Sequence, residues 1–175
     1  MANYFEFVSK YKDCGLPLPQ PATPGSAGLD LRAAQDTIIP PFASKRELYP
    51  KGEAVTLEEN EKIIKEIGGK LTMVSTGLKV HLDEGYYLAI TPRSSMPLKQ
   101  WLFIGNTQAV VDRDYILADN EGEIFIQLIN MTPNPIHIKK GDRIGQALFI
   151  PYVLPENVKP ENKVRTGGHG STGTK

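Results

Sequence analysis

The segment GNTQAVVDRDY (105–115) carries the residues best suited to acid–base chemistry. Asp112 ends the apolar run Ala109–Val111, and a carboxylate beside apolar residues is the kind of group that serves as a general base. Asn106 offers the amide donor and acceptor that match a nucleobase edge, and Tyr115 offers a flat aromatic face. A plain hairpin with polar residues at its exit fits the same letters, so the segment alone leaves both interpretations open.

The segment PRSSMPLK (92–99) is suited to binding phosphate. It places a guanidinium fork and two hydroxyls in a row, at Arg93, Ser94 and Ser95. Arginine binds phosphate oxygens in a bidentate manner, and hydroxyls add donors. The alternative is a polar turn in which Arg93 makes a structural ion pair.

Two strand-like segments carry further polar side chains. Asp30 in SAGLDLRA stands between Leu29 and Leu31, and a carboxylate flanked by core residues is more often an ion-pair partner than a catalyst. In GDRIGQALF, we expect a structural role for Arg143 and a ligand-binding amide at Gln146.

The segment RTGGHGSTGTK (165–175) is rich in glycine. Its G-x-G-x-x-G pattern is not a dinucleotide fingerprint, because that motif needs a following helix and a later acid. Glycines let backbone N–H groups surround phosphate oxygens, and Ser171 and Thr172 add hydroxyls. A disordered tail is the alternative.

The bulk of the chain indicates an all-β fold in one domain of 175 residues. Prolines and glycines divide it into short strand-like pieces, which is typical of a barrel or a double-sheet jelly roll. We expect 70–82 and 86–91 to form a hairpin around the turn DEG. The strand-like pieces are 70–82, 86–91, 101–105, 108–111, 123–130, 136–138 and 143–150.

One segment, TLEENEKIIKEIGGK (56–70), has the pattern of a helix instead. Thr56 and Glu59 form a capping box, and the apolar residues fall on one side. We expect a surface insertion packed against the barrel; a docking surface for a partner is the other interpretation.

Charge and composition exclude several classes of protein. Lys and Arg together number 20, as do Asp and Glu, which argues against a nucleic-acid coat. The single cysteine, Cys14, indicates a reducing compartment. No segment has the length of a membrane span or the pattern of a signal peptide. We therefore expect a cytoplasmic protein that binds neither nucleic acid nor membranes.

In order, AGLDLRA, PRSS, GN…VVDRDY, DRIGQALF and RTGGHGSTG resemble the five motifs of the trimeric dUTP pyrophosphatases, the dUTPase family. The resemblance spans about residues 26–173. It implies a β-clip-like jelly-roll domain (1–163), an inserted helix (about 44–70), a flexible Gly-rich lid arm (164–175) and a homotrimer. The implied activity is hydrolysis of dUTP to dUMP and pyrophosphate, which keeps uracil out of DNA and supplies dUMP for dTMP synthesis.

The resemblance also implies roles for single residues. Asp112 would activate water for attack on the α-phosphate, and Tyr115 would pack under the deoxyribose. Uracil would be read by Asn106 and the backbone of Ala109, Val110 and Val111. The phosphates would be held by Arg93, Ser94, Ser95 and Gln146.

For the metal and the lid arm the resemblance implies indirect contacts. Mg²⁺ would be bound mainly through substrate phosphates and water, with Asp30 near the metal-bound waters and no direct protein ligand. The arm would close from a neighbouring subunit, with His169 over the uracil. Its γ-phosphate contacts would be Arg165, Gly170, Ser171 and Thr172.

The sequence departs from the family pattern in several places. His169 replaces the usual phenylalanine, and Arg165 stands one residue closer to the glycines. The segment ILADNE (116–121) lengthens the exit after Tyr115. Neither this segment nor the 44–70 insertion has a catalytic explanation, so a protein-binding role for either is open.

Two rival functions fit parts of the pattern. A dCTP deaminase has a glutamate on the strand after the base-reading segment, where this chain has Gln127, which cannot act as an acid. A nucleotide-sensing or regulatory protein without catalysis is disfavoured by Asp112.

Overall fold

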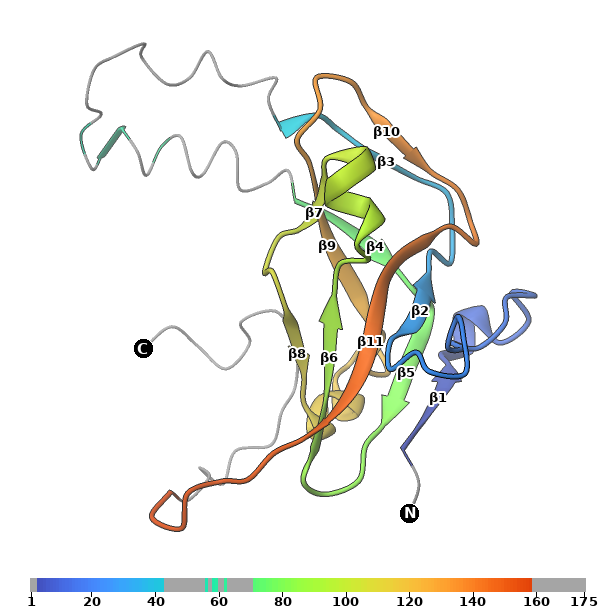
Figure 1. Cartoon of the computed structure of the whole chain (residues 1–175), viewed down its shortest axis with the longest axis vertical. Helices are drawn as coiled ribbons and strands as arrows, with labels where there is room; N and C mark the ends of the chain where they lie inside the picture. The colour runs from blue at the N-terminus through green and yellow to red at the C-terminus, as the bar shows by residue number, and fades with distance from the viewer. Residues whose placement is uncertain (1–2, 43–55, 57, 60–61, 63–70, 159–175) are drawn as a thin grey trace.

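The computed structural model describes residues 3–42, 56, 58, 59, 62 and 71–158 (Figure 1). The described part of the chain contains eleven strands and three short helical turns, besides the helical residues Glu58, Glu59 and Lys62 of the insertion. In chain order they are β1 (Tyr4–Phe7), η1 (Ser9–Tyr11), β2 (Leu29–Arg32), β3 (Thr37–Ile39), β4 (Thr72–Ser75), β5 (Leu78–His81), β6 (Tyr86–Thr91), η3 (Met96–Gln100), β7 (Leu102–Ile104), β8 (Ala109–Val111), η4 (Arg113–Leu117), β9 (Phe125–Asn130), β10 (Ile136–Ile138) and β11 (Arg143–Pro151).

Two antiparallel sheets form the body of the molecule. One has the strand order β2-β11-β6-β8 and the other β4-β9-β7, with two smaller pairs, β1-β5 and β10-β3. In Figure 1, β11, β6 and β8 run side by side. The nine residues of β11 pair with both β2 and β6, so this strand aligns the segments that carry three of the five motifs.

The core lies between the two larger sheets. Along β9 the side chains alternate between partly and fully buried, the period of two that a strand with one core-facing side requires. Leu88 and Ile90 of β6 and Ile126 and Leu128 of β9 belong to the same buried cluster. Each such side chain contributes about 1.5–3 kcal/mol by leaving water. The prediction of an all-β jelly-roll fold is confirmed.

The expected strand 70–82 is two strands, and its predicted hairpin with 86–91 is wrong. Gly77 has φ +67°, and a Cβ there would come within 2.8 Å of the Tyr11 ring, so the chain bends between β4 and β5. β4 pairs with β9 and β5 with β1, whereas β6 pairs with β11 and β8. The DEG turn therefore links strands that do not pair with each other.

The hairpin interpretation of 105–115 is also wrong. β7 pairs with β9 and β8 pairs with β6, so the turn between them carries the chain from one sheet to the other. Thr107 sits in this turn with φ +56°, and its N–H donates to the Ile104 carbonyl at 3.0 Å. Local sequence cannot distinguish a hairpin from a crossing, because both need the same turn residues.

The capping box that begins the inserted helix is confirmed. The Thr56 N–H donates to Glu59 Oε2 at 2.8 Å, and the Glu59 N–H donates to Thr56 Oγ1 at 3.2 Å. The first of these bonds is the main reason that the pKa of Glu59 lies below its usual value. Glu58, Glu59 and Lys62 are helical, and the rest of the insertion lies outside the described residues. Each helix within the described residues is too short or too polar to cross a membrane.

Candidate functional site

Three charged side chains meet where β2, the start of β11 and the end of β6 come together. Arg93 Nε lies 2.7 Å from Asp30 Oδ1, and Arg143 Nη1 lies 3.0 Å from Asp30 Oδ2. The two arginines are more exposed than the carboxylate between them, which is 14% exposed. One negative charge between two positive ones leaves a net positive site, which favours an anion. The ion-pair role expected for Asp30 is confirmed, and Arg93 makes the ion pair that was the alternative interpretation of its segment.

The register of β11 brings Gln146 to the same place. Gln146 is paired with Asp30 on β2 and with Thr91 on β6, and its Nε2 donates to the Pro92 carbonyl at 3.2 Å. A Cβ at Gly28 would lie 2.5 Å from Gln146 Oε1, so a larger residue there would displace this amide from its present position. We call Asp30, Arg93, Arg143 and Gln146 the arginine cluster. Sequence reasoning did not find Gly28, although its place two residues before Asp30 was a signal.

The hydroxyls of the PRSS segment lie in the turn beside this cluster. β6 ends at Thr91, and the Met96 N–H closes the turn on the Arg93 carbonyl at 2.9 Å. Ser94 is exposed and Ser95 partly buried at the start of η3. The structure thus brings Arg93 together with Gln146 of β11, and Ser94 and Ser95 follow Arg93 in the turn after β6.

Asp112 stands at the start of a different turn. It follows β8, and the Tyr115 N–H donates to the Asp112 carbonyl at 3.1 Å, which begins η4. The Asp112 side chain is exposed, so the preceding valines do not enclose it as the sequence suggested. In a strand alternate side chains point to opposite faces: Val111 points into the core and Val110 outward.

Tyr115 is held in place by hydrogen bonds to residues that follow it in the chain. It is 7% exposed and belongs to the core cluster, and its hydroxyl donates to the Glu123 carbonyl at 2.9 Å. The same hydroxyl accepts from Asn120 Nδ2 at 3.1 Å. Sequence reasoning did not find Asn120 or Glu123 as its partners. The lengthened segment after Tyr115 was a signal, but its sequence does not reveal which residues it contacts.

The arginine cluster and Asp112 lie at opposite ends of β6. Val111 is paired with Leu88 near the beginning of β6, whereas Arg93 follows its last residue, Thr91. At 3.3 Å per residue the separation along the strand is roughly 15–20 Å. One chain therefore does not bring Asp112 to the predicted phosphate site.

The predicted base-reading residues lie between these two regions. Asn106 is exposed in the turn before β8, and Ala109 and Val110 are paired with Ile90 and Ala89 on one side. β8 is the outer strand of its sheet among the described strands. An outer strand presents one row of backbone N–H and C=O groups to an approaching partner.

The predicted arm contacts lie outside the described residues. These are Arg165, His169, Gly170, Ser171 and Thr172. Among the described residues, His, Cys, Asp and Glu side chains do not gather in threes as a metal cage would require. The Asp30 carboxylate has about four acceptor sites and uses two for arginines, so it can still accept from water bound to a metal.

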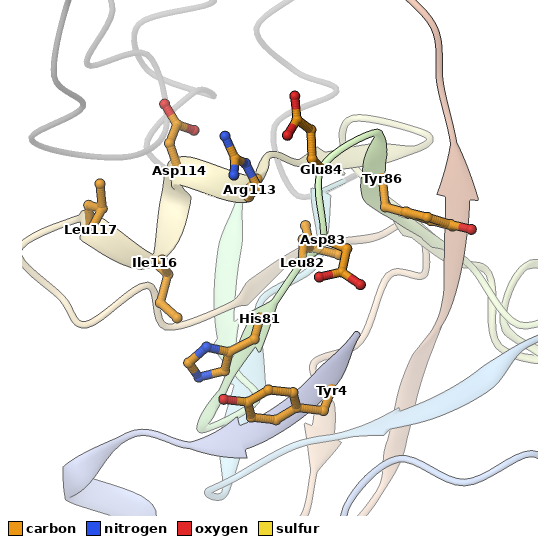
Figure 2. Close-up of a pocket in the computed structure, with 10 residues that line it drawn as sticks. All are labelled: Tyr4, His81, Leu82, Asp83, Glu84, Tyr86, Arg113, Asp114, Ile116 and Leu117. Atoms are coloured by element: carbon orange, nitrogen blue, oxygen red, sulfur yellow. The ribbon is translucent and has the colours of Figure 1, made fainter. Parts of the chain in front are cut away.

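An open groove of about 970 Å³ lies beside η4 (Figure 2). Figure 2 shows Arg113, Asp114, Ile116 and Leu117 on one side and His81 with Tyr4 on the other. The His81 and Tyr4 rings are stacked 4.2 Å apart. Among the described residues, no predicted site residue lines this groove, although Arg113 directly follows Asp112.

Known proteins match nearly the whole chain. The sequence model of the dUTPase family matches residues 57–175. The deoxyuridine 5'-triphosphate nucleotidohydrolase of Lactococcus lactis is 34% identical over 171 residues, which are 97% of this chain and 96% of that protein. The protein of the same name from Dictyoglomus turgidum is 36% identical over 165 residues, 92% of this chain and 93% of that protein.

The fold agrees with these matches. The crystal structure of dUTPase from Streptococcus mutans superposes with a TM-score of 0.69 at 31% identity, covering 88% of this chain and 99% of that one. The resemblance inferred from the five motifs is confirmed, and the chain belongs to the dUTPase family.

Proposed function

We propose that this protein hydrolyses dUTP to dUMP and pyrophosphate. The observation that carries the proposal is the arginine cluster, a net-positive phosphate site built from three of the family's motifs. In the reaction, water oxygen bonds to the α-phosphorus while the bond from that phosphorus to the α,β-bridging oxygen breaks. The water proton passes to the carboxylate of Asp112, and pyrophosphate leaves with the electron pair.

The active site is formed between copies of the chain. A general base must lie within about 3 Å of the water it activates, but Asp112 is roughly 15–20 Å from its own arginine cluster. Asp112 of one copy therefore serves the arginine cluster of another, and the assembly is a homotrimer, as in the family the motifs resemble. A neighbouring copy would also cover Asp112, which is exposed in one chain.

The nucleoside is recognised around β8. The outward backbone groups of Ala109, Val110 and Val111 and the amide of Asn106 bind the uracil edge, which the position of β8 at the sheet edge supports. Tyr115 lies under the deoxyribose and excludes a 2′-hydroxyl. Little of the Tyr115 ring is exposed. The ring therefore offers the sugar a fixed edge or face and does not move when the substrate binds.

A magnesium ion would be held mainly by the triphosphate and water, in keeping with the preference of Mg²⁺ for phosphate oxygens. It would supply positive charge that neutralises the phosphates. Asp30, held by two arginines, would accept hydrogen bonds from the water around the ion, and Arg93 and Gln146 would orient the phosphate chain.

The arm at 164–175 closes over the bound nucleotide. Arg165, Gly170, Ser171 and Thr172 contact the γ-phosphate and His169 covers the base, which excludes bulk water. A protein ending at residue 163 should remain folded and assembled by light scattering but be nearly inactive. Full activity of this truncated protein would remove the arm from the mechanism.

A panel of nucleotides tests the function directly. Purified protein is incubated with each dNTP, UTP and dUDP, with Mg²⁺ and with EDTA, and the release of pyrophosphate is measured. We expect rapid release from dUTP with Mg²⁺ only. Equal turnover of dTTP or dCTP would contradict the assignment. Deamination of dCTP is not expected, because Gln127 is an amide and cannot act as the acid. Its Oε1 would lie 3.5 Å from a Cβ at Gly105.

A further inference from the structure

The lengthened exit after Tyr115, residues 116–121, has a structural purpose. We propose that Asn120 is a positioning residue for Tyr115, through which this segment sets the discrimination between deoxyribose and ribose. The inference rests on the proposed function, since it assigns the segment a role in selecting the sugar of that substrate.

The contacts of Asn120 form a closed set around the phenol. Its Nδ2 donates to the Tyr115 hydroxyl at 3.1 Å and to the Glu123 carbonyl at 3.2 Å, while its Oδ1 accepts from the Gly122 N–H at 3.2 Å. The hydroxyl in turn donates to the Glu123 carbonyl at 2.9 Å. The opposite amide orientation would face two oxygens against each other, so only this arrangement satisfies every partner.

The segment that carries Asn120 is itself anchored. Glu121 Oε2 accepts from the Ser9 N–H at 3.2 Å and from Ser9 Oγ at 2.9 Å, and it lies 3.8 Å from Lys79 Nζ. Glu121 and Gly122 both have left-handed backbones, at φ +60° and +72°. A Cβ at Gly122 would lie 2.6 Å from the Ile116 Cα, so the loop returns directly against η4. Asn120 is thus held at a fixed place behind the ring.

The consequence for the substrate side follows from the geometry. The Tyr115 hydroxyl is engaged as donor and as acceptor within the chain, so the phenol cannot turn toward a 2′-hydroxyl to hydrogen-bond it. The Tyr115 N–H also holds the carbonyl of Asp112. A ring fixed in this way rejects ribose by shape, and loosening the ring weakens that rejection.

This role also narrows the protein-binding interpretation of 116–121. Leu117, Asp119, Asn120 and Glu121 are all exposed, but the contacts above tie the polar ends of the Asn120 and Glu121 side chains to the rest of the molecule. Asp119 therefore supplies a matched control from the same segment.

The experiment compares selectivity rather than activity alone. The ratio of kcat/KM for dUTP to kcat/KM for UTP is measured for the wild type, Asn120→Ala and Asp119→Ala, together with Tm. We expect Asn120→Ala to lower the ratio by about three- to tenfold, the usual worth of one hydrogen bond, and Asp119→Ala to leave it unchanged. In a Tyr115→Phe background, Asn120→Ala should change the ratio less than about twofold, because the hydroxyl that it holds is gone.

The outcomes separate the two proposals. A wild-type protein that does not hydrolyse dUTP overturns the proposed function. An active wild type whose Asn120→Ala variant keeps the full ratio overturns the positioning role alone, even if Tm falls. If Asn120→Ala does not fold, Asn120→Ser, which keeps an acceptor for the Gly122 N–H, should lower the ratio to the same extent, and an unchanged ratio in that variant overturns the role. Equal effects of Asn120→Ala in both backgrounds also overturn it.

Discussion

The two ends of β6 carry sites of opposite construction. At one end the arginine cluster consists of partly exposed charged side chains joined by ion pairs. At the other end the Asp112 turn is held by backbone hydrogen bonds and by the buried phenol of Tyr115. Ion pairs between charged side chains hold the first region together, whereas burial of an aromatic side chain holds the second together.

Because the two regions are built differently, substitutions in one should affect substrate binding and substitutions in the other should affect the stability of the fold. Ion pairs that solvent reaches contribute about 0–1 kcal/mol each to folding, and both arginines of the cluster are partly exposed, so they can exchange Asp30 for a phosphate at a small cost. Breaking a buried hydrogen bond leaves an unsatisfied group at about 1–3 kcal/mol. Substitutions in the cluster should therefore change substrate affinity, and substitutions behind Tyr115 should change stability as well.

The largest effect is expected at Asp112. Asp112→Asn removes the proton acceptor but keeps the size of the side chain, so kcat should fall by roughly 10²–10⁴ while dUTP still binds. Stopped-flow or steady-state kinetics measure kcat, and calorimetry with a nonhydrolysable analogue measures binding. Asp119→Asn, an exposed aspartate of the same region, is the control. Activity within a few-fold of wild type would show that Asp112 is not the base.

The second prediction tests whether the two regions belong to different copies. Asp112→Asn and Arg93→Gln are co-expressed with different tags, and mixed assemblies are purified through both. The assay uses dUTP far below the KM, where sites that lack Arg93 contribute little. If each site combines Asp112 of one copy with Arg93 of the next, one site of each mixed trimer is intact, so about a third of wild-type activity should return. Sites contained within one chain would give no restoration above the two parent variants.

The third prediction concerns affinity at the cluster. Arg93→Gln removes the guanidinium proposed to bind the phosphates and should raise the KM for dUTP by about tenfold or more, with a small change in Tm. Arg143→Gln, which also contacts Asp30, is the comparison, and we expect a smaller rise in KM because Arg143 begins its strand as a structural partner. Equal rises in KM for the two variants would show that both arginines have the same role.

The fourth prediction concerns stability behind the Asp112 turn. Tyr115→Phe removes the hydroxyl that joins Asn120 to the Glu123 carbonyl, so the free energy of unfolding should fall by about 1 kcal/mol. Urea unfolding followed by fluorescence measures it. If Tyr115→Phe lowered the free energy of unfolding no more than Arg93→Gln does, the two regions would not differ in their contribution to stability.

The smallest effect is expected at Glu121. The hydrogen bond from the Ser9 hydroxyl, followed by that from the Ser9 N–H, lowers the pKa of Glu121. A lowered folded-state pKa stabilises the protein above the ordinary carboxyl range, and that contribution disappears as the pH falls through the lowered value. Glu121→Gln should reduce Tm slightly at neutral pH, and this reduction should shrink as the pH falls below the ordinary carboxyl range. A larger difference in acid than at neutral pH would contradict this assignment.

Pairing partners were the weakest part of the sequence-based prediction. Strands such as β6, β9 and β11 were found nearly to the residue, because alternation and turn residues are local signals. The predicted hairpin of 70–82 with 86–91 and the hairpin interpretation of 105–115 were both wrong, because which strand lies beside another is decided by burial of faces from distant segments. The partners of Tyr115 were missed for the same reason: the Asn120 amide is recognisable as a contact only once the loop has folded back.

The sequence by itself determined the family, the fold class and the identity of the polar residues, since five ordered motifs and the strand pattern are properties of the chain. Only the tertiary structure decided that Asp30 lies between Arg93 and Arg143, that Gly28 makes room for Gln146, and that Asp112 lies at the other end of β6. Those facts depend on strand register, and register is set by how side chains from segments far apart in sequence bury one another.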